Sequence, residues 1–315
     1  MKKSSFWKYG LVVISIVAIL LFACGDNNGS SGSNTSGEGN GTGNGGGENS
    51  VAVTAVMLNK ATLSIAIGGT ETLTAAVAPE NATNKAVTWT IDDDTVATVS
   101  NGTVTAVKVG SAIITVKTTD GNKTATCAVT VTRAQYEPNA TDKTTNIGKL
   151  GPGGGTIFYV SASGFTVTGT GSFTAYYLEA APINQATSFP WCAHDGSCLP
   201  NTDTAIGTGK ANTAAILANG FHIIDDGNNA AAARVCANIT IGGKTDWFLP
   251  SKDELNEMYK ARTHLEISEG RFWSSSQYVS YGTSGNAWGK DFADGSESTA
   301  SKVFGRLDVR AIRAF

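Results

Sequence analysis

Histidine and cysteine are scarce in this sequence, and their scarcity limits the chemistry that it can carry. Only three histidines and five cysteines occur among 315 residues. His194, His222 and His264 lack the spacing of metal ligands, and none belongs to a recognisable nucleophile motif with a serine or a cysteine. The sequence therefore predicts no metal site, no cofactor and no catalytic residue, and we do not expect an enzyme.

Charged side chains are also few, and positive charge is not in excess. Only 16% of the residues are charged, and 23 Lys and Arg against 26 Asp and Glu give a formal net charge of −3. Binding to nucleic acid usually needs a basic surface that displaces counterions from the phosphates, so no nucleic-acid partner is expected. Glycine is abundant instead, with 37 residues, as is typical of β-rich extracellular modules with a Gly, Ser, Thr and Asn surface.

Residues 1–24 are predicted to be a lipoprotein signal peptide. Three lysines precede an apolar run over 9–23, whose 15 residues are fewer than the roughly 20 of a membrane-spanning helix. The run ends in Leu-Phe-Ala-Cys at 21–24, which resembles the bacterial lipobox, although Phe22 is bulkier than the residue usually found there. The resemblance implies a diacylglycerol on Cys24 and a membrane as partner; the alternative is ordinary secretory cleavage beside a chance cysteine.

Residues 25–50 are predicted to be a disordered tether. They contain ten glycines, no Lys or Arg, and no aliphatic or aromatic side chain. A segment without apolar side chains cannot bury a core, and a flexible coil of this length spans roughly 25–30 Å on average. The tether would hold the following domain away from its anchor.

Residues 51–133 are predicted to form an all-β sandwich. Short runs of β-branched residues alternate with turn signals such as Asn101-Gly102 and Asp120-Gly121, which favour hairpins. Eight strands in so short a segment are typical of a sandwich. The expected strands are Val51–Leu58, Leu63–Ile67, Thr72–Val77, Val87–Ile91, Val96–Val99, Thr103–Val107, Ala112–Lys117 and Thr124–Val131.

This segment resembles the bacterial Ig-like group 2 domain. The motifs that carry the resemblance are Leu73–Pro79, Val87–Thr90, Val96–Val99, Gly102–Ala106 and Gly110–Ile114. The resemblance implies a spacer that presents other modules on a bacterial surface. Trp89 is expected in the core of the sandwich, and Cys127 is expected to be a buried thiol because the segment contains no second cysteine.

After a polar joint at 134–146, residues 147–315 are predicted to form an α+β domain. The clearest helix begins after Pro250, where Ser251 and Glu254 have the spacing of a capping box. Other helices are expected at 212–219 and 230–238. The expected strands are Thr156–Val160, Ala175–Ala180, Phe272–Ser276, Ala287–Phe292 and Lys302–Phe304, and the chain ends on Val309–Phe315.

This region resembles the Legionella collagen-like protein C-terminal domain family. The matching pieces, spread over nearly the whole region, are Ile147-Gly148, Gly151–Tyr159, Leu178–Pro182, Ala205–Thr213, Gly242–Ser251, Phe272–Ser276, Ala287-Trp288, Phe292 and Val309–Arg313. The resemblance implies a surface-displayed, C-type-lectin-like fold, and in the eponymous protein the domain binds sulfated glycans and host surfaces. Relatives often carry a cysteine where this chain has Ala311, which leaves Cys236 without its usual partner.

Cys192 and Cys198 are predicted to form a disulfide. Export would carry them to an oxidising compartment, and the short loop between them contains a turn glycine, Gly196. Pairing of either cysteine with Cys236 stays open as the alternative, because three cysteines in one exported domain leave one unpaired.

The stretch Ala205–Lys210 invites comparison with a phosphate-binding loop. Position 204 is Thr where the first glycine of such a loop should be, and Ala211 replaces the Ser or Thr that follows its lysine. We therefore interpret these glycines as structural.

A ligand-binding surface is predicted from aromatic and basic side chains of the second domain. Rings and hydrogen-bonding groups suit sugars, and cations suit acidic glycans. The candidates are Tyr278, Tyr281, Lys302, Arg306, Arg310 and Arg313. The alternative for Arg310 and Arg313 is burial beside carboxylates in the core.

The sequence as a whole predicts a bacterial surface lipoprotein, lipid-anchored in the cell envelope at the outer membrane or cell surface. An Ig-like spacer would present a lectin-like domain that binds a glycan or a protein ligand, as in adhesion. One alternative is a structural or assembly component of the envelope. A polysaccharide-active enzyme is a weaker alternative, since it needs paired carboxylates, for which Asp225 with Asp226 or Asp291 with Asp294 come first.

Overall fold

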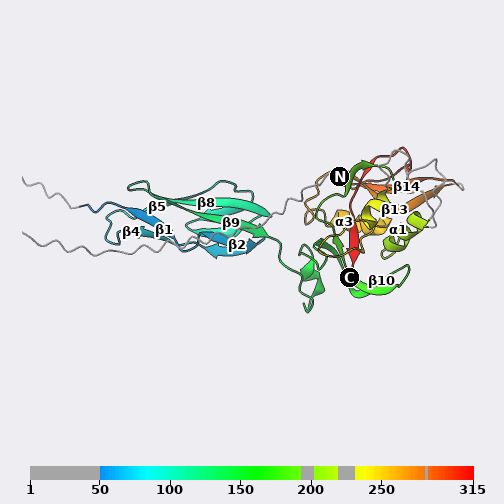
Figure 1. Ribbon diagram of the computed structural model, residues 1–315, viewed down its shortest axis with the longest axis horizontal. Helices are drawn as coiled ribbons and strands as arrows, with labels where there is room; N and C mark the ends of the chain where they lie inside the picture. The colour runs from blue at the N-terminus through cyan, green and yellow to red at the C-terminus, as the bar shows by residue number, and fades with distance from the viewer. Residues whose placement is uncertain (1–49, 193–201, 219–230, 281–282) are drawn as a thin grey trace, which may run out of the picture. The chain divides into compact units, whose positions relative to one another are not determined.

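The computed structural model describes residues 50–192, 202–218, 231–280 and 283–315 (Figure 1). The predicted signal peptide with Cys24 and nearly all of the predicted tether lie outside these residues. The described part falls in one compact unit, Ser50–Phe315. No helix within the described ranges has both the length and the apolar character needed to cross a bilayer.

The segment up to Thr132 is a β-sandwich, as its alternating pattern predicts. One sheet has the strand order β2-β9-β8-β5, a second has the order β3-β7-β6, and β1 pairs with β4. The strands are β1 (Ala55–Leu58), β2 (Thr62–Ala66), β3 (Thr70–Thr72), β4 (Ala75–Ala78), β5 (Val87–Ile91), β6 (Ala97–Ser100), β7 (Thr103–Ala106), β8 (Gly110–Thr118) and β9 (Thr124–Thr132).

The run expected as one strand over 72–77 is instead divided between two sheets. Leu73, only 2% exposed, lies between β3 and β4 and donates its N–H to the carbonyl of Gly102. The next N–H, of Thr74, donates to the Asn59 side chain at 2.9 Å. These bonds satisfy the backbone at the crossing, so the chain can leave one sheet for the other without an unpaired group.

The core of the sandwich follows the period of two that a half-buried strand requires. Buried and more exposed residues alternate along β9, and Cys127, Val129 and Val131 point inward. Trp89 is half-buried and packs against this core, and Cys127 is a buried free thiol as predicted.

The remainder of the described chain is β-rich with three short α-helices. A three-stranded sheet has the order β10-β11-β17, and a five-stranded sheet has the order β12-β16-β13-β14-β15. The elements are η1 (Lys143–Asn146), β10 (Thr156–Val167), β11 (Phe173–Ala180), β12 (Ala186–Phe189), α1 (Gly209–Ala218), α2 (Ala232–Ala237), α3 (Lys252–Lys260), β13 (Arg271–Ser280), β14 (Thr283–Asp291), β15 (Glu297–Ser301), β16 (Leu307–Val309) and β17 (Ile312–Ala314).

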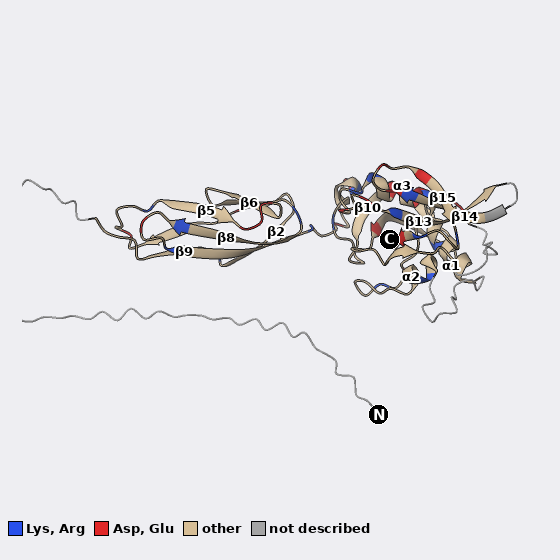
Figure 2. Cartoon of the chain, turned by 90° about the horizontal axis from the view of Figure 1, so that it is seen from above, with Lys and Arg blue, Asp and Glu red and all other residues tan. Residues whose placement is uncertain are grey.

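Charged side chains of this part meet around α3 and β15. Figure 2 shows blue and red segments close together there, and Lys252 on α3 forms an ion pair with Glu297 on β15 at 2.8 Å. The capping box predicted for α3 is present, with Ser251 as N-cap and Glu254 as its partner. The sequence therefore identified the start of this helix correctly.

One strand expected near the C-terminus is absent, and the terminal run is divided between two sheets. Lys302–Phe304 is a turn instead of a strand, because Gly305 N–H closes back onto the carbonyl of Ser301 at 2.8 Å. The terminal run is two strands in different sheets: β16 pairs with β12 and β13, whereas β17 pairs with β11. Arg310 lies at the crossing between them.

Candidate functional site

The glycine-rich stretch Ala205–Lys210 surrounds a carboxylate of the same chain. Glu254 is 0% exposed; its Oε1 accepts the N–H of Gly207 at 2.8 Å, and its Oε2 accepts the N–H of Ser251 at 2.7 Å. A Cβ at Gly209 would lie 2.2 Å from Oε2. These contacts explain the glycines without a phosphate, and burial raises the pKa of Glu254 to about 7.

A second glycine-rich turn, 151–155, surrounds another buried carboxylate. Glu179 on β11 accepts N–H bonds from Gly153 at 2.9 Å and Gly155 at 3.0 Å. Arg313 on β17 bonds the same carboxylate at 2.9 Å and Asp246 at 2.6 Å. Desolvation dominates and raises the pKa of Glu179 in spite of the arginine. This network is structural, since it links the turn to both strands.

The basic surface predicted from Lys302, Arg306, Arg310 and Arg313 is not formed. Lys302 is 0% exposed, with its Nζ 3.1 Å from Gln277 Oε1, and burial lowers its pKa to about 8. Arg310 and Arg313 are buried as well, and Arg313 pairs with carboxylates as the alternative interpretation held, whereas Arg310 donates to Asn184 and Pro182. Arg306 is exposed but donates to carbonyls of its own turn. Three of the four side chains are buried and the fourth is bonded within its own turn, so they do not present a common charged face.

The aromatic residues predicted to contact a ligand have different positions. Tyr278 is half-buried and lies edge-on to Trp288, with ring centroids 5.1 Å apart. Tyr281 lies outside the described residues. Trp273 is fully buried and donates its indole N–H to the carbonyl of Phe189 at 2.7 Å, so it belongs to the core.

The cysteines of this region exclude one of the two predicted pairings. Cys192 is buried and disulfide-bonded, whereas Cys236 has a free, fully buried thiol. The alternative bridge to Cys236 is therefore absent. Cys198 lies outside the described residues, so the Cys192–Cys198 bridge stays a prediction.

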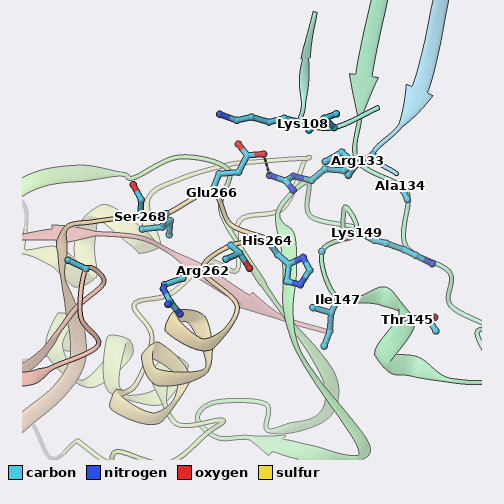
Figure 3. A pocket seen from close by; sticks show the side chains of 16 residues that line it. Lys108, Arg133, Ala134, Thr145, Ile147, Lys149, Arg262, His264, Glu266 and Ser268 are labelled. Carbon is cyan, nitrogen blue, oxygen red and sulfur yellow. Dashed lines mark hydrogen bonds and ion pairs between the residues drawn. The ribbon is translucent and has the colours of Figure 1, made fainter. Parts of the chain in front are cut away.

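A cavity of about 960 Å³ among the described residues has a basic lining that sequence reasoning missed (Figure 3). Its lining residues are Ile67, Val107, Lys108, Arg133, Ala134, Thr145, Ile147, Gly148, Lys149, Arg262, Thr263, His264, Glu266, Ile267, Ser268 and Ala293. They come from distant parts of the sequence, and no motif relates them. The local sequence signal for this cavity is limited to basic residues that directly follow other elements, Arg133 after the sandwich and Arg262 after α3.

One ion pair fixes the position of the acidic residue in this cavity. Arg133 Nη2 lies 3.0 Å from Glu266 Oε1, as the dashed line in Figure 3 marks. Glu266 has a φ of +56°, a backbone conformation that costs a non-glycine residue free energy and is held by surrounding contacts. Close by, Gly148 has a φ of +82°, and a Cβ there would lie 2.8 Å from His264 Nδ1. The wall beside His264 therefore requires glycine.

Positive charge predominates in the cavity. Lys108, Arg133, Lys149 and Arg262 line it, against the single carboxylate of Glu266. Lys149 pairs with Glu137 outside the lining at 2.9 Å, while the Arg262 guanidinium lies over the Tyr259 ring, 4.3 Å from its centroid. Within the described ranges, no group of three or more side chains could hold a metal ion. The arrangement suits an anionic ligand held by several cations.

Comparison with known proteins identifies the sandwich. Residues 52–129 match the family model of the bacterial Ig-like domain (group 2). The expectation from the strand motifs is thereby confirmed for this part of the chain. The lectin-like assignment of the remainder stays a prediction.

Curated relatives share a segment of about the length of this Ig-like domain. An Ig-like virion protein of Serratia phage KSP90 is 53% identical over 83 residues, which cover 26% of this chain and 32% of that protein. The lacto-N-biosidase of Bifidobacterium bifidum is 47% identical over 83 residues, which cover 26% of this chain and 7% of the enzyme. The chain spans less than a third of the length of these relatives.

Solved structures that resemble part of this chain include domains of an S-layer protein. A crystal structure of domains 4 and 5 of the S-layer protein SbsC matches 25% of this chain and 51% of that chain, with 26% identity and a TM-score of 0.22.

Proposed function

We propose that this is a bacterial surface protein whose Ig-like domain presents the C-terminal region as a non-catalytic binding module. The Ig-like match supports a modular design, since the relatives include a virion protein and a much larger glycosidase that share such a segment. The predicted lipid on Cys24 and the glycine-rich tether would fix the module to the cell envelope and let it reach outward.

The ligand that we propose is an acidic glycan, bound in the basic cavity of Figure 3. The observation that carries this proposal is the set of four cations around one carboxylate in a hollow of about 960 Å³, a volume typical of ligand sites. A sulfated or uronate-bearing sugar would meet the lysines and arginines with its anionic groups. Binding at this cavity does not need the buried cations of the C-terminal strands.

The test is retention of the purified mature protein on immobilised heparin, used as a model sulfated glycan. Lys108→Gln with Lys149→Gln removes two cations of the cavity lining. We expect affinity to fall at least about a hundredfold, because hydrogen bonds to charged groups contribute about 1.5–3 kcal/mol each and about 1.4 kcal/mol corresponds to a tenfold change. We also expect added salt to weaken the binding of the unaltered protein.

The matched control is Lys117→Gln with Lys123→Gln, which removes two exposed lysines that do not line the cavity. Its net charge equals that of the first variant, so a general loss of charge would weaken both equally. An equal loss in both variants, or no salt-sensitive retention of the unaltered protein, would refute the glycan site. The alternative of an envelope assembly component would then be favoured.

A further inference from the structure

We propose a second binding site, beside Arg310, that takes the C-terminal carboxylate of a peptide whose last side chain is apolar. The site lies in a smaller hollow of about 360 Å³ beside the basic cavity of Figure 3, and the two hollows share Glu266, Ile267 and Ser268 as lining residues. It does not depend on the proposed glycan site.

Arg310 is a buried cation that has no acidic partner in the part of the chain that the structure describes. The residue is 6% exposed; its Nη1 donates to Asn184 Oδ1 at 3.0 Å and its Nη2 to the carbonyl of Pro182 at 2.9 Å. Its Nε has no hydrogen-bond partner among the described residues. Arg313, three residues later, instead pairs with two carboxylates. Because an unpaired buried charge is costly, the arrangement of Arg310 indicates that an anion completes it.

The guanidinium stays charged despite its burial. Desolvation, together with the nearby Arg133, lowers the pKa of Arg310 to about 10, and Glu266 opposes this change. At neutral pH the group is therefore a cation. Its planar fork of N–H donors matches the two oxygens of a carboxylate.

The lining of the hollow indicates which chemical group lies next to the ligand's carboxylate. Ile183, Ile267 and Phe272 contribute apolar surface, and Ile183 is 69% exposed. An apolar side chain next to the carboxylate would cover this surface. A uronic acid would place hydroxyl groups there instead, so the walls favour a peptide end over a sugar acid.

Acidic residues on the rim limit the ligand to a single negative charge. Glu266 and Glu269 also line the hollow. Glu266 is paired with Arg133, so repulsion of a polyanion such as a sulfated glycan would come mainly from Glu269. A ligand with one carboxylate, bound at Arg310, would instead place its neutral or basic part beside Glu269. The charge pattern therefore differs from that of the basic cavity.

The test uses the full mature protein and three small probes. N-acetyl-leucine has the carboxylate and the apolar side chain, N-acetyl-leucinamide lacks only the charge, and glucuronate carries a carboxylate on a sugar. We expect saturable binding of N-acetyl-leucine by isothermal titration calorimetry, with a roughly millimolar Kd for so small a ligand. We expect neither of the other probes to bind at the same concentrations.

Two variants test the residues. Arg310→Gln should weaken N-acetyl-leucine binding at least about tenfold, since it removes the charged donor. Because this change leaves two acceptors unpaired and can lower stability, Glu269→Gln is the second variant; it removes a repelling charge from the rim and should tighten binding about twofold. The control is Glu257→Gln on α3, outside the lining of the hollow, with no expected effect.

Three results would overturn the proposal. N-acetyl-leucinamide binding as well as N-acetyl-leucine would mean that Arg310 does not recognise charge. Equal binding of glucuronate would assign the site to a sugar acid. Unchanged or weaker binding in Glu269→Gln would place the carboxylate elsewhere. None of these results bears on heparin retention, so failure here and failure of the glycan site are distinguishable.

Discussion

Replacement of Glu254 by Gln should remove a large pH dependence from the stability of the C-terminal region. The carboxyl is fully buried, and burial raises its pKa from 4.5 to about 7. Below about pH 4.5 the group is protonated in both folded and unfolded chains. Between about pH 4.5 and 7 the unfolded chain loses this proton while the folded chain keeps it, so the free energy of unfolding falls as the pH rises.

The magnitude follows from the two pKa values. Each unit of difference corresponds to 1.36 kcal/mol, so the values of 4.5 and about 7 give a loss of roughly 3 kcal/mol between acid and neutral pH. Gln resembles the protonated acid but turns an NH₂ group toward one of the two backbone N–H donors, those of Gly207 and Ser251. This mismatch should cost about 1–3 kcal/mol at every pH.

The assay is urea unfolding of the full mature protein at pH 4.5 and pH 8, followed by tryptophan fluorescence. At pH 4.5 we expect the unaltered protein to be more stable than Glu254→Gln by about 1–3 kcal/mol. At pH 8 this advantage should be lost or reversed, because the unaltered protein then has an ionised carboxylate in a buried position. Other titrating groups occur in both proteins, and their effects cancel in the difference.

Leu255→Ala is the control for this experiment. Leu255 is 2% exposed on the same helix and does not titrate, so its loss should cost about 2–5 kcal/mol equally at both pH values. A stability difference between Glu254→Gln and the unaltered protein that is the same at pH 4.5 and pH 8 would refute the reasoning. It would mean that water or local opening keeps the carboxyl solvated.

Three further predictions concern the anchor, the disulfide and the buried cations. Cys24→Ala should release the protein from membranes, and unchanged partitioning into detergent would contradict the lipobox interpretation. Peptide mapping without reduction should recover Cys192 linked to Cys198, and any other partner would contradict that prediction. Arg313→Ala should lower stability by about 3–5 kcal/mol because it leaves a buried carboxylate unpaired, whereas Arg306→Ala should stay within about 0.5 kcal/mol; equal changes in Tm would contradict the assignment.

Local sequence was sufficient to predict those elements whose structure depends on residues close together in the chain. The alternation along β8 and β9 and the Asp120-Gly121 turn between them predict that hairpin, because a strand has a period of two and a tight turn needs glycine. The capping box of Ser251 and Glu254 likewise depends on only four residues. Such signals identified the sandwich and α3, although the split of 72–77 between sheets escaped them.

The basic cavity and the fate of the C-terminal cations were decided by tertiary structure alone. Arg133 and Glu266 are 133 residues apart, and Arg313 and Glu179 are 134 residues apart. Composition shows that such charges exist, but not which ones pair, which are buried, and which line a cavity. A charged side chain has no periodic signature of burial, because its environment is set by strands and loops from remote parts of the chain. Only their packing distinguishes exposed Arg306 from buried Arg310.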